Sequence, residues 1–526
     1  MDLRQRTSNT IKNTTVGLFT QVIQVFSSFL CRFVFVHVLT ESYLGVNELF
    51  ANILALLSLG SLGIGSAVTF ELYRSLANND EEETKALMNF YRKAYSIVGV
   101  VIGFIGFFLF PFINKLVSLD NTIHANIYMM YALYLSDVVI SYFFSYKSSI
   151  IEASQQNYIL STIHAAVTIV QNILQCIILI TTRNYMLYLV IQVFCSISYN
   201  VFVAHAADRL FPILKDKNIR EVKPDNQKRM YRNIRDIFIE NIAGKLMNST
   251  DNIIITAVGG LASTGLNSNY SLLYATLVTF TTKIQLGIAS SVGNVNAVES
   301  KEKRLQLFDE IHFSFFWMYF WCACCYILLV QDVISLFFGP RYLMSFAVAV
   351  ITGLNFYIAE EGTVVTIFKS TMGLFSKGKL VAVFTGIINI ILSILLGREY
   401  GVFGILLATF ISRIVTVRWY MPYVTFKYGF HASSKRYFLD ELRYWLEGIF
   451  IFLITYYICT RLQMAGVLLL FIKAIICLFV PNMLIIVLHY RDPYFLVLKE
   501  RIVRTVSSIL KKYGSKNKDS EDLKND

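Results

Sequence analysis

Residues 94–114 read AYSIVGVVIGFIGFFLFPFIN, a run without a charged side chain that lies between Arg92-Lys93 and Lys115. A helix of about 20 apolar residues crosses the roughly 30 Å hydrocarbon core of a bilayer, so this run is typical of a transmembrane helix. Apolar runs of similar length recur from one end of the chain to the other. A transmembrane β-barrel would instead show alternating segments of about 10 residues. The pattern therefore predicts an all-α polytopic membrane protein.

The apolar runs predict about fourteen transmembrane helices. Their approximate bounds are 16–38, 44–70, 94–114, 125–146, 159–181, 185–206, 234–258, 267–293, 308–330, 344–368, 380–397, 401–420, 445–461 and 464–490. Hydrophobic residues make up 55% of the chain and charged residues only 16%, whereas a soluble domain carries about 25% charge. This composition excludes a set of soluble domains.

Basic residues are concentrated in every second connection between the predicted helices. The net charge is +12, but it forms no single patch of the kind that binds nucleic acid. The opposite set of connections contains only Lys115, Arg183, Arg341, Arg398 and Arg461. Because positive loops face the cytoplasm, this alternation predicts that both termini are cytoplasmic.

The longest internal connection is basic and divides the helices into six and eight. The predicted parts are a six-helix lobe at 1–206, a basic linker at 207–233, a second six-helix lobe at 234–420, helices thirteen and fourteen within 421–490, and an amphipathic and disordered tail at 491–526. Two six-helix lobes related by repetition would enclose a central cavity.

A faint repeat supports the two lobes. Gly45-Val46-Asn47 comes at the start of the second predicted helix, and Gly265-Leu266-Asn267 comes just before the eighth. Similar strings, Leu62–Val68 and Leu286–Val292, follow at comparable distances. Chance similarity between strings of small and apolar residues is the competing interpretation.

Three cations fall at membrane depth, where an ionisable group costs about 2.5–3.5 kcal/mol and normally faces a cavity or a partner. A wet chamber lined by cations favours an anionic group such as a pyrophosphate, which arginine binds with two parallel hydrogen bonds. The predicted substrate-binding residues are these cations and the asparagines that share a helix face with Lys245: Arg32, Lys245, Lys283, Asn241, Asn248 and Asn252.

Acidic residues inside the predicted helices are candidates for coupling transport to an ion, either H⁺ or Na⁺. They are Glu48, Asp137, Asp251, Glu360 and Glu361. Structural roles compete with these assignments. Arg32 pairs with Glu48 in one alternative, Lys245 pairs with Glu240 or Asp251 in another, and the Glu360–Glu361 pair forms a solvated rim in a third.

The cysteines give no sign of a metal site. All eight lie in or beside apolar runs, and Cys322-Ala323-Cys324-Cys325 has no histidine or second cysteine pair at metal-binding spacing. We predict no metal and no cofactor.

The N-terminal third resembles the polysaccharide transporter family, the oligosaccharide-repeat flippases of the multidrug/oligosaccharidyl-lipid/polysaccharide (MOP) exporter superfamily. The stretches that carry the resemblance are Asn13–Gly17, Arg32–Phe35, Tyr43–Phe50, Leu57–Ala67 and Leu87–Tyr95. The drug exporters of the superfamily look less similar, because the first predicted helix lacks their acidic residue and proline.

The resemblance implies two six-helix bundles, alternating access and an undecaprenyl-pyrophosphate-linked oligosaccharide moved across the bacterial cytoplasmic membrane for surface polysaccharide biosynthesis. Arg32 matches the position of a chamber arginine that holds the pyrophosphate. Membrane lipids, a polysaccharide polymerase and glycosyltransferases are the implied partners.

Other functions compete with this one. The same fold suits a peptidoglycan lipid precursor or a drug cation. A membrane glycosyltransferase or polymerase is disfavoured, because the outer connections are short and offer mainly Asp120 and Asp332 as catalytic acids. We therefore predict a transporter and not an enzyme.

Overall fold

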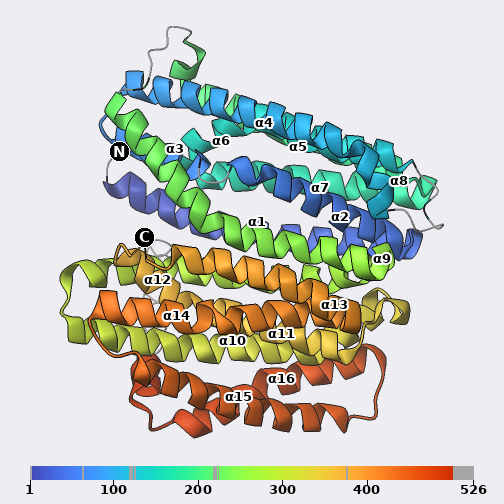
Figure 1. Cartoon of the computed structure of the whole chain (residues 1–526), viewed down its shortest axis with the longest axis vertical. Coiled ribbons are helices and arrows are strands. Elements are labelled where there is room, and N and C mark those ends of the chain that lie inside the picture. The colour runs from blue at the N-terminus through green and yellow to red at the C-terminus, as the bar shows by residue number, and fades with distance from the viewer. Residues whose placement is uncertain are drawn as a thin grey trace, which may run out of the picture. The chain divides into compact units, whose positions relative to one another are not determined.

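The computed structural model of the chain describes residues 3–61, 64–117, 123, 126–216, 222, 224–374 and 377–500. These residues form α-helices and a few short 3-10 or π turns, with no strand among them (Figure 1). The all-α prediction is confirmed. The helices are α1 Leu3–Val38, α2 Glu41–Leu57, α3 Ile64–Ala77, α4 Glu81–Val117, α5 Ile127–Phe144, α6 Ser148–Ala153, α7 Asn157–Thr182, α8 Tyr185–Leu210, α9 Pro224–Val298, α10 Lys301–Phe337, α11 Phe346–Glu361, α12 Thr363–Thr371, α13 Lys379–Val415, α14 Val417–Val424, α15 Lys435–Thr460 and α16 Gly466–His489.

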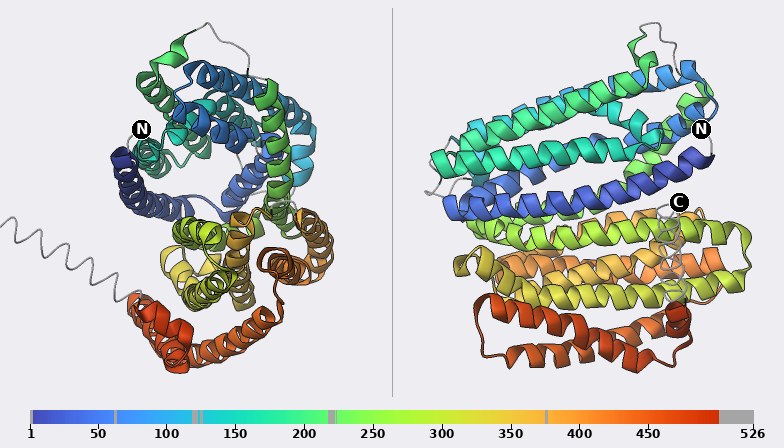
Figure 2. Two further views of the ribbon diagram at one scale, coloured as in Figure 1. Left: turned by 90° about the vertical axis from the view of Figure 1, so that its left-hand side faces the viewer. Right: turned by 180° about the vertical axis from the view of Figure 1, so that it is seen from behind.

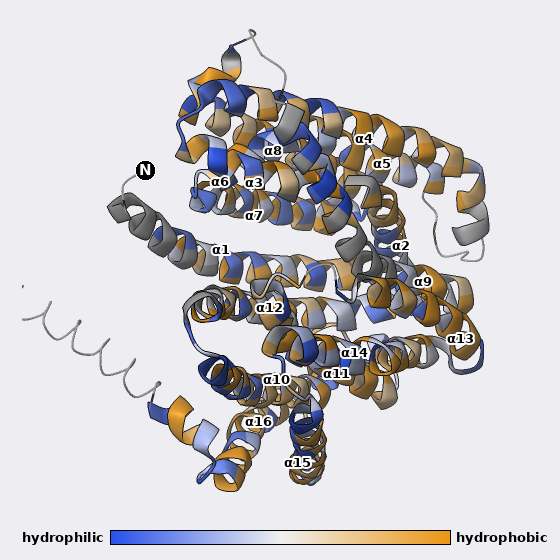
Figure 3. Ribbon diagram, turned by 60° about the vertical axis from the view of Figure 1, so that its left-hand side comes forward, coloured by the Kyte–Doolittle hydropathy of each residue, from blue (hydrophilic) through white to orange (hydrophobic). Residues whose placement is uncertain are grey.

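The chain is a multi-pass membrane protein. Eleven segments of its described part are long and apolar enough to cross a bilayer. Figure 3 shows apolar residues along the length of α4, α5, α15 and α16. Large apolar side chains such as Phe104 and Phe471 are exposed on these helices, as lipid-facing residues are. The count of fourteen and the cytoplasmic termini stay predictions.

Two of the longest helices each contain a break at a glycine. Gly260 in α9 has φ 77° and ψ 176°, and Gly401 in α13 has φ 58° and ψ −139°. Glycine adopts such values readily because it lacks a Cβ atom. The breaks lie at or beside the two gaps that we predicted between neighbouring spans, after 258 and after 397.

The predicted helix over 44–70 is interrupted in the structure. A 3-10 turn at Ser58–Ser61 follows α2, and α3 begins at Ile64. The Ser58 hydroxyl donates to the carbonyl oxygen of Leu54 at 2.8 Å, a local bond that competes with the helix. Glycine and serine have low helix propensity, so the run Ser58–Gly65 outweighs the apolar pattern on which the prediction rested.

The helices form two compact units. Unit 1 contains 1–271, 337–344 and 379–412, and unit 2 contains 272–336, 345–378 and 413–526. Figure 2 shows the long helices of each unit running side by side. The lobes predicted at 1–206 and 234–420, the linker at 207–233, the helix pair in 421–490 and the tail at 491–526 stay predictions, and residues 501–526 of that tail lie outside the described residues.

Unit 1 packs through apolar and polar contacts. Its apolar core joins α3, α4, α6, α8 and the start of α9. Along α1 and α7 the contacts are polar: Asn172 donates to the Ser27 hydroxyl at 2.9 Å, and the Gln24 amide lies 2.9 Å from His164 Nδ1.

The core of unit 2 is aromatic. The Phe308 ring packs against Phe368, Phe426 and Phe430, which brings α10, α12 and the π turn at 425–430 together.

Candidate functional site

Arg32 on α1 donates hydrogen bonds to two neutral side chains of α9. Its Nε lies 3.0 Å from Asn269 Oδ1, and its Nη2 donates to the Ser268 hydroxyl. Glu48 attracts the guanidinium electrostatically, but no ion-pair contact within 4.0 Å joins the two side chains. Arg32 therefore keeps its charge without a direct carboxylate partner among the described residues.

Polar groups from three further helices lie near this arginine. The Tyr134 hydroxyl on α5 donates to Asn47 Oδ1 on α2 and lies 3.2 Å from the Tyr185 hydroxyl on α8. Tyr185 in turn is within electrostatic reach of Arg32. Asn47 belongs to the first copy of the Gly-x-Asn repeat, so the repeat contributes to this polar cluster.

The two copies of the repeat also pack directly against each other. A side chain at Gly45 would collide with the carbonyl oxygen of Leu261, and one at Gly265 would collide with the carbonyl oxygen of Glu41. The contact is reciprocal, because Glu41 precedes Gly45 by the same four positions by which Leu261 precedes Gly265. This geometry favours a true repeat over chance similarity.

The end of α1 is held by the short segment 337–344 of unit 1. The Val36 carbonyl oxygen accepts a hydrogen bond from Arg341 Nη2 at 2.7 Å and one from the Tyr342 hydroxyl at 2.8 Å. The Tyr270 hydroxyl accepts from the Met344 backbone N–H at 3.0 Å. Helices from the first and second half of the sequence are thus joined at this end of unit 1.

Asp251 on α9 belongs to an oxygen-rich cluster with α13. Thr409 Oγ1 donates to Asp251 Oδ2 at 2.8 Å, and Asn389 Nδ2 donates to Thr409 Oγ1 at 2.9 Å. Asn389 is fully buried, and its Oδ1 has no hydrogen-bond partner in the described part of the chain. Carboxylate, amide and hydroxyl oxygens are the ligands of hard cations, so this cluster can hold a proton or a small hard cation.

Sequence reasoning missed Asn389 and Thr409. The sequence offers one signal for a functional role of these residues, namely that both are polar and lie inside apolar runs. They lie on either side of Gly401, and the break at this glycine lets α13 double back so that the two side chains meet.

The predicted asparagine stripe is only partly described. Asn252 Oδ1 accepts a hydrogen bond from Asn267 Nδ2 at 3.2 Å, which again involves the Gly-x-Asn repeat. The side chains of Asn241, Lys245 and Asn248 lie outside the described residues, as does any pairing of Lys245. Asp137 on α5 lies near the polar side chains of Ser196 and Gln192 on α8, and its buried Oδ1 has no hydrogen-bond partner in the described part of the chain.

In unit 2, Lys283 is exposed on the second half of α9, and Glu360 is buried. Glu360 Oε2 accepts hydrogen bonds from Gln285 Nε2 at 2.7 Å and from the Thr281 hydroxyl at 3.1 Å. Glu361 is 0% exposed. The alternative that this acidic pair forms a solvated rim is therefore wrong, because α10 and its neighbours cover both side chains.

Glu361 meets three residues that sequence reasoning missed. His312 Nε2 lies 3.0 Å from Glu361 Oε1 and 3.1 Å from Glu441 Oε1. Arg418 Nη2 binds Glu361 Oε2 and lies 2.8 Å from Glu441 Oε1. The four residues come from α10, α11, α14 and α15, so no spacing in the sequence announces them.

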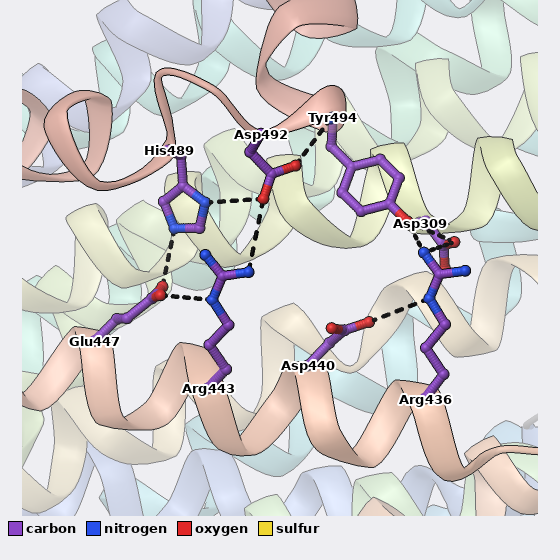
Figure 4. Close-up of polar contacts among 8 residues, drawn as sticks. All are labelled: Asp309, Arg436, Asp440, Arg443, Glu447, His489, Asp492 and Tyr494. Atoms are coloured by element: carbon purple, nitrogen blue, oxygen red, sulfur yellow. Dashed lines mark hydrogen bonds and ion pairs between the residues drawn. The ribbon is translucent and has the colours of Figure 1, made fainter.

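A second polar network ties the end of α16 to α15 and α10, as Figure 4 shows. Glu447 lies 2.9 Å from His489 Nε2 and 2.7 Å from Arg443 Nε. Arg436 pairs with Asp309 at 3.2 Å, and the Tyr494 hydroxyl donates to Asp309 at 3.0 Å. Burial and the neighbouring Asp309 raise the pKa of Tyr494, which keeps this hydroxyl a donor.

The fold is similar to that of solved transporter structures. The lipid II flippase MurJ in an inward closed conformation matches with a TM-score of 0.63 and 13% identity, over 91% of this chain and 99% of that chain. An inward-facing multidrug resistance MATE family transporter matches with a TM-score of 0.58 and 12% identity, over 76% of this chain and 96% of that chain. A MOP superfamily transporter from Pyrococcus furiosus matches with a TM-score of 0.50 and 14% identity, over 79% and 94%.

No protein-family model matches the chain, and no curated protein matches it. At such low identity the structural likeness shows the fold alone. The chain has the fold of MOP superfamily flippases and transporters, and the predicted resemblance is confirmed at the level of the superfamily fold. Membership of the oligosaccharide-repeat flippases stays a prediction.

Proposed function

We propose that this chain is a flippase that moves an undecaprenyl-pyrophosphate-linked oligosaccharide from the inner to the outer leaflet of the bacterial cytoplasmic membrane. The observation that carries the proposal is the state of Arg32. Its guanidinium is bonded to Ser268 and Asn269, both neutral, inside a predicted membrane span. A membrane protein keeps such a charge where its function needs one.

A pyrophosphate suits this arginine. In hydrogen bonds between a guanidinium and phosphate oxygens both partners are charged, whereas in those to Ser268 and Asn269 only the donor is charged. Cargo can therefore replace these two partners with stronger ones. The further contacts that we propose to the head group are Lys245, Lys283, Asn241, Asn248 and Asn252.

The repeat supports alternating access. Because Gly45 and Gly265 each pack on the backbone of the other copy, the first turns of the two helices fit closely without any intervening side chain. When the transporter opens at this end, Gly45 and Gly265 move apart. When it closes, each glycine again packs on the backbone of the other copy of the repeat. The lobes that move are 1–206 and 234–420.

Asp251, Asn389 and Thr409 are the favoured site for a coupling ion, since the Thr409 hydroxyl is hydrogen-bonded both to the Asp251 carboxylate and to the Asn389 amide. H⁺ and Na⁺ both suit this group. Glu48, Asp137, Glu360 and Glu361 are the other acidic candidates. An inside-negative potential also favours outward movement of an anion by about 2.3 kcal/mol per charge per 100 mV, so the coupling ion supplements this drive.

The proposed setting follows from the cargo. Glycosyltransferases build the lipid-linked sugar on the cytoplasmic side, a polymerase uses it on the outer side, and membrane lipids surround the transporter. The chain itself needs no catalytic residue.

A second cargo is favoured by one observation. The lipid II flippase matches a larger share of this chain than the MATE transporter does, 91% against 76%. A peptidoglycan lipid precursor also carries a pyrophosphate, so Arg32 serves either cargo. A drug cation is disfavoured, because the arginine would repel it.

The experiment uses the full chain in proteoliposomes that contain an undecaprenyl-pyrophosphate oligosaccharide. A membrane-impermeant lectin counts the sugar that reaches the other leaflet. We expect wild-type protein to expose the sugar and Arg32→Ala to lose at least nine-tenths of this activity. Arg461→Ala is the matched control, since Arg461 is exposed and contacts Tyr457, whose ring lies 4.8 Å away and whose hydroxyl accepts from Nη2 at 3.1 Å. This variant is expected to keep full activity.

Normal activity of the Arg32→Ala variant would remove this arginine from the mechanism. Lipid II replaces the oligosaccharide lipid in a parallel set of vesicles. Transport of lipid II alone would reject the leading cargo in favour of the second one.

A further inference from the structure

The ionic cluster of unit 2 has an unbalanced charge. Glu361 and Glu441 bring two negative charges, and Arg418 brings one positive charge, because an arginine stays protonated in proteins. With a neutral His312 the cluster carries one net negative charge. With a protonated His312 it is neutral. Burying an uncompensated ion costs several kcal/mol, so the burial of these side chains favours one extra proton.

Both acids lie close to the imidazole. His312 Nε2 hydrogen-bonds with Glu441 Oε1 at 3.1 Å and lies at an ion-pair distance of 3.0 Å from Glu361 Oε1. The imidazole is 2% exposed and stacks on the Tyr437 ring at 4.9 Å. The Tyr437 hydroxyl also donates to Glu441 Oε1 at 3.1 Å, whereas the buried Glu361 Oε1 accepts no hydrogen bond in the described part of the chain.

Further charged groups surround His312. Asp309 on its own helix and Asp440 on α15 interact electrostatically with it. Arg436 lies within ion-pair distance of both of these acids, at 3.2 Å and 3.9 Å, and Arg443 pairs with Glu447. Two tyrosines complete the surroundings: Tyr357 on α11 is within electrostatic range of Glu441, and the Tyr444 ring on α15 lies 5.2 Å from the imidazole.

A metal ion fits this cluster less well than a proton does. One ligand atom each from His312, Glu361 and Glu441 lies within 4.8 Å of the others, a set that zinc accepts. Arg418 Nη2, however, binds both carboxylates. A divalent ion would leave the cluster with a net charge of +1, whereas a proton makes it neutral.

The cluster is one of the ionic links between α15 and its neighbours, another being the pair of Arg436 with Asp309 on α10. Elsewhere α15 packs on α10 through rings, with Tyr444 stacked on Phe316 at 4.3 Å and Gly448 beside Phe320. Trp445 lies next to the cluster, and its ring is 5.0 Å from that of Tyr357 on α11. Only the contacts of Glu441 in this set depend on the number of bound protons.

We propose that His312, Glu361 and Glu441 form a buried site for one exchangeable proton, which fastens the first turns of α15 to α10 and α11. Loss of the proton leaves a net negative charge, and α15 then moves away from α11. The site goes beyond the proposed function, because it requires no particular cargo.

The test follows Trp445 in the purified full chain in detergent micelles. Emission is recorded from pH 5 to pH 10 for the wild type and for Trp445→Phe, and the difference spectrum isolates this tryptophan. We expect a shift to longer wavelength along a one-proton titration curve as the pH rises. His312→Gln is expected to abolish the curve, because glutamine keeps a donor but binds no proton.

His489→Gln is the matched control. His489 is also buried, at 1% exposed, and also contacts two acids, Glu447 and Asp492. We expect this variant to keep the Trp445 curve with its midpoint within half a pH unit of wild type. Loss of the curve in this control would overturn the assignment to His312, as would a wild-type signal that does not change with pH.

Glu441→Gln supplies a second measurement should His312→Gln fail to fold. This change makes the cluster neutral with an unprotonated histidine, so the midpoint is expected to fall by at least one pH unit. An unchanged midpoint would contradict the proposal. Stoichiometric zinc in purified wild-type protein, absent from His312→Gln, would show a metal site instead and would also overturn it.

Discussion

Two arginines of this protein lie in contrasting surroundings. Arg32 in unit 1 bonds to a hydroxyl and an amide, whereas Arg418 in unit 2 bonds to two carboxylates. Carboxylates in direct contact neutralise the charge of Arg418, and these ion pairs hold helices of unit 2 together. The charge of Arg32 is not cancelled by a direct partner, so it is available to an anion that arrives from outside.

The difference shows how to separate a structural cation from a functional one inside a membrane. Both side chains cost free energy to bury, and an acid that balances the charge offsets this cost. Unit 1 leaves the balance to Glu48, which attracts Arg32 without an ion-pair contact, and such an incomplete balance is expected where a ligand supplies further negative charge.

Removing each arginine in turn is expected to give the largest difference in stability between the two regions. Arg418→Met leaves Glu361 and Glu441 buried without their cation, so the free energy of unfolding should fall by about 3–5 kcal/mol. Arg32→Met removes two hydrogen bonds to neutral partners and an attraction to Glu48 that involves no ion-pair contact, so it should cost less, about 1–3 kcal/mol. Denaturant titration of both variants in detergent micelles measures the difference. Equal losses would mean that Arg32 is a structural ion as well.

A new carboxylate beside Arg32 is expected to make unit 1 resemble unit 2. In Ser268→Asp the acid replaces a hydroxyl that now accepts from Arg32 Nη2. Affinity for a pyrophosphate lipid should drop by about 1.5–3 kcal/mol, roughly 10- to 150-fold, since the cargo loses a charge-assisted bond. Ser268→Ala is the control with no charge change. Similar affinities of the two variants would show that charge is not what the cargo recognises.

Lys283 is expected to give the smallest effect. This lysine is exposed on α9, and an exposed ion pair is weak because water and salt screen it. Lys283→Ala should therefore weaken pyrophosphate-lipid binding roughly two- to fivefold. Together with Lys245→Ala, the loss should exceed that of the single variant. Unchanged affinity of the double variant would remove both lysines from the proposed chamber.

Breaks in the helices at or near glycines were predicted from the sequence in one place and missed in another. The predicted gap between the seventh and eighth spans coincides with the break at Gly260, because a loss of apolar pattern and a glycine point to the same position. The span over 44–70 was misread as one helix, since its apolar pattern continues through the 3-10 turn at Ser58–Ser61. Hydropathy indicates which residues prefer lipid, and it does not detect a local break in the backbone of a helix.

The sequence by itself determined that this chain spans a membrane many times as helices. Apolar runs, low charge and alternating basic connections depend only on the order of residues along the chain, so they can be read without the structure. The sequence also exposed Arg32 and the Gly-x-Asn repeat, which depend on the type of one residue or on a short string. Only the tertiary structure decided which buried charges are balanced. His312, Glu361, Arg418 and Glu441 come from four helices, and Asp251, Asn389 and Thr409 from two. Electrostatic pairing depends on distance in space, and helix packing sets that distance independently of separation along the chain.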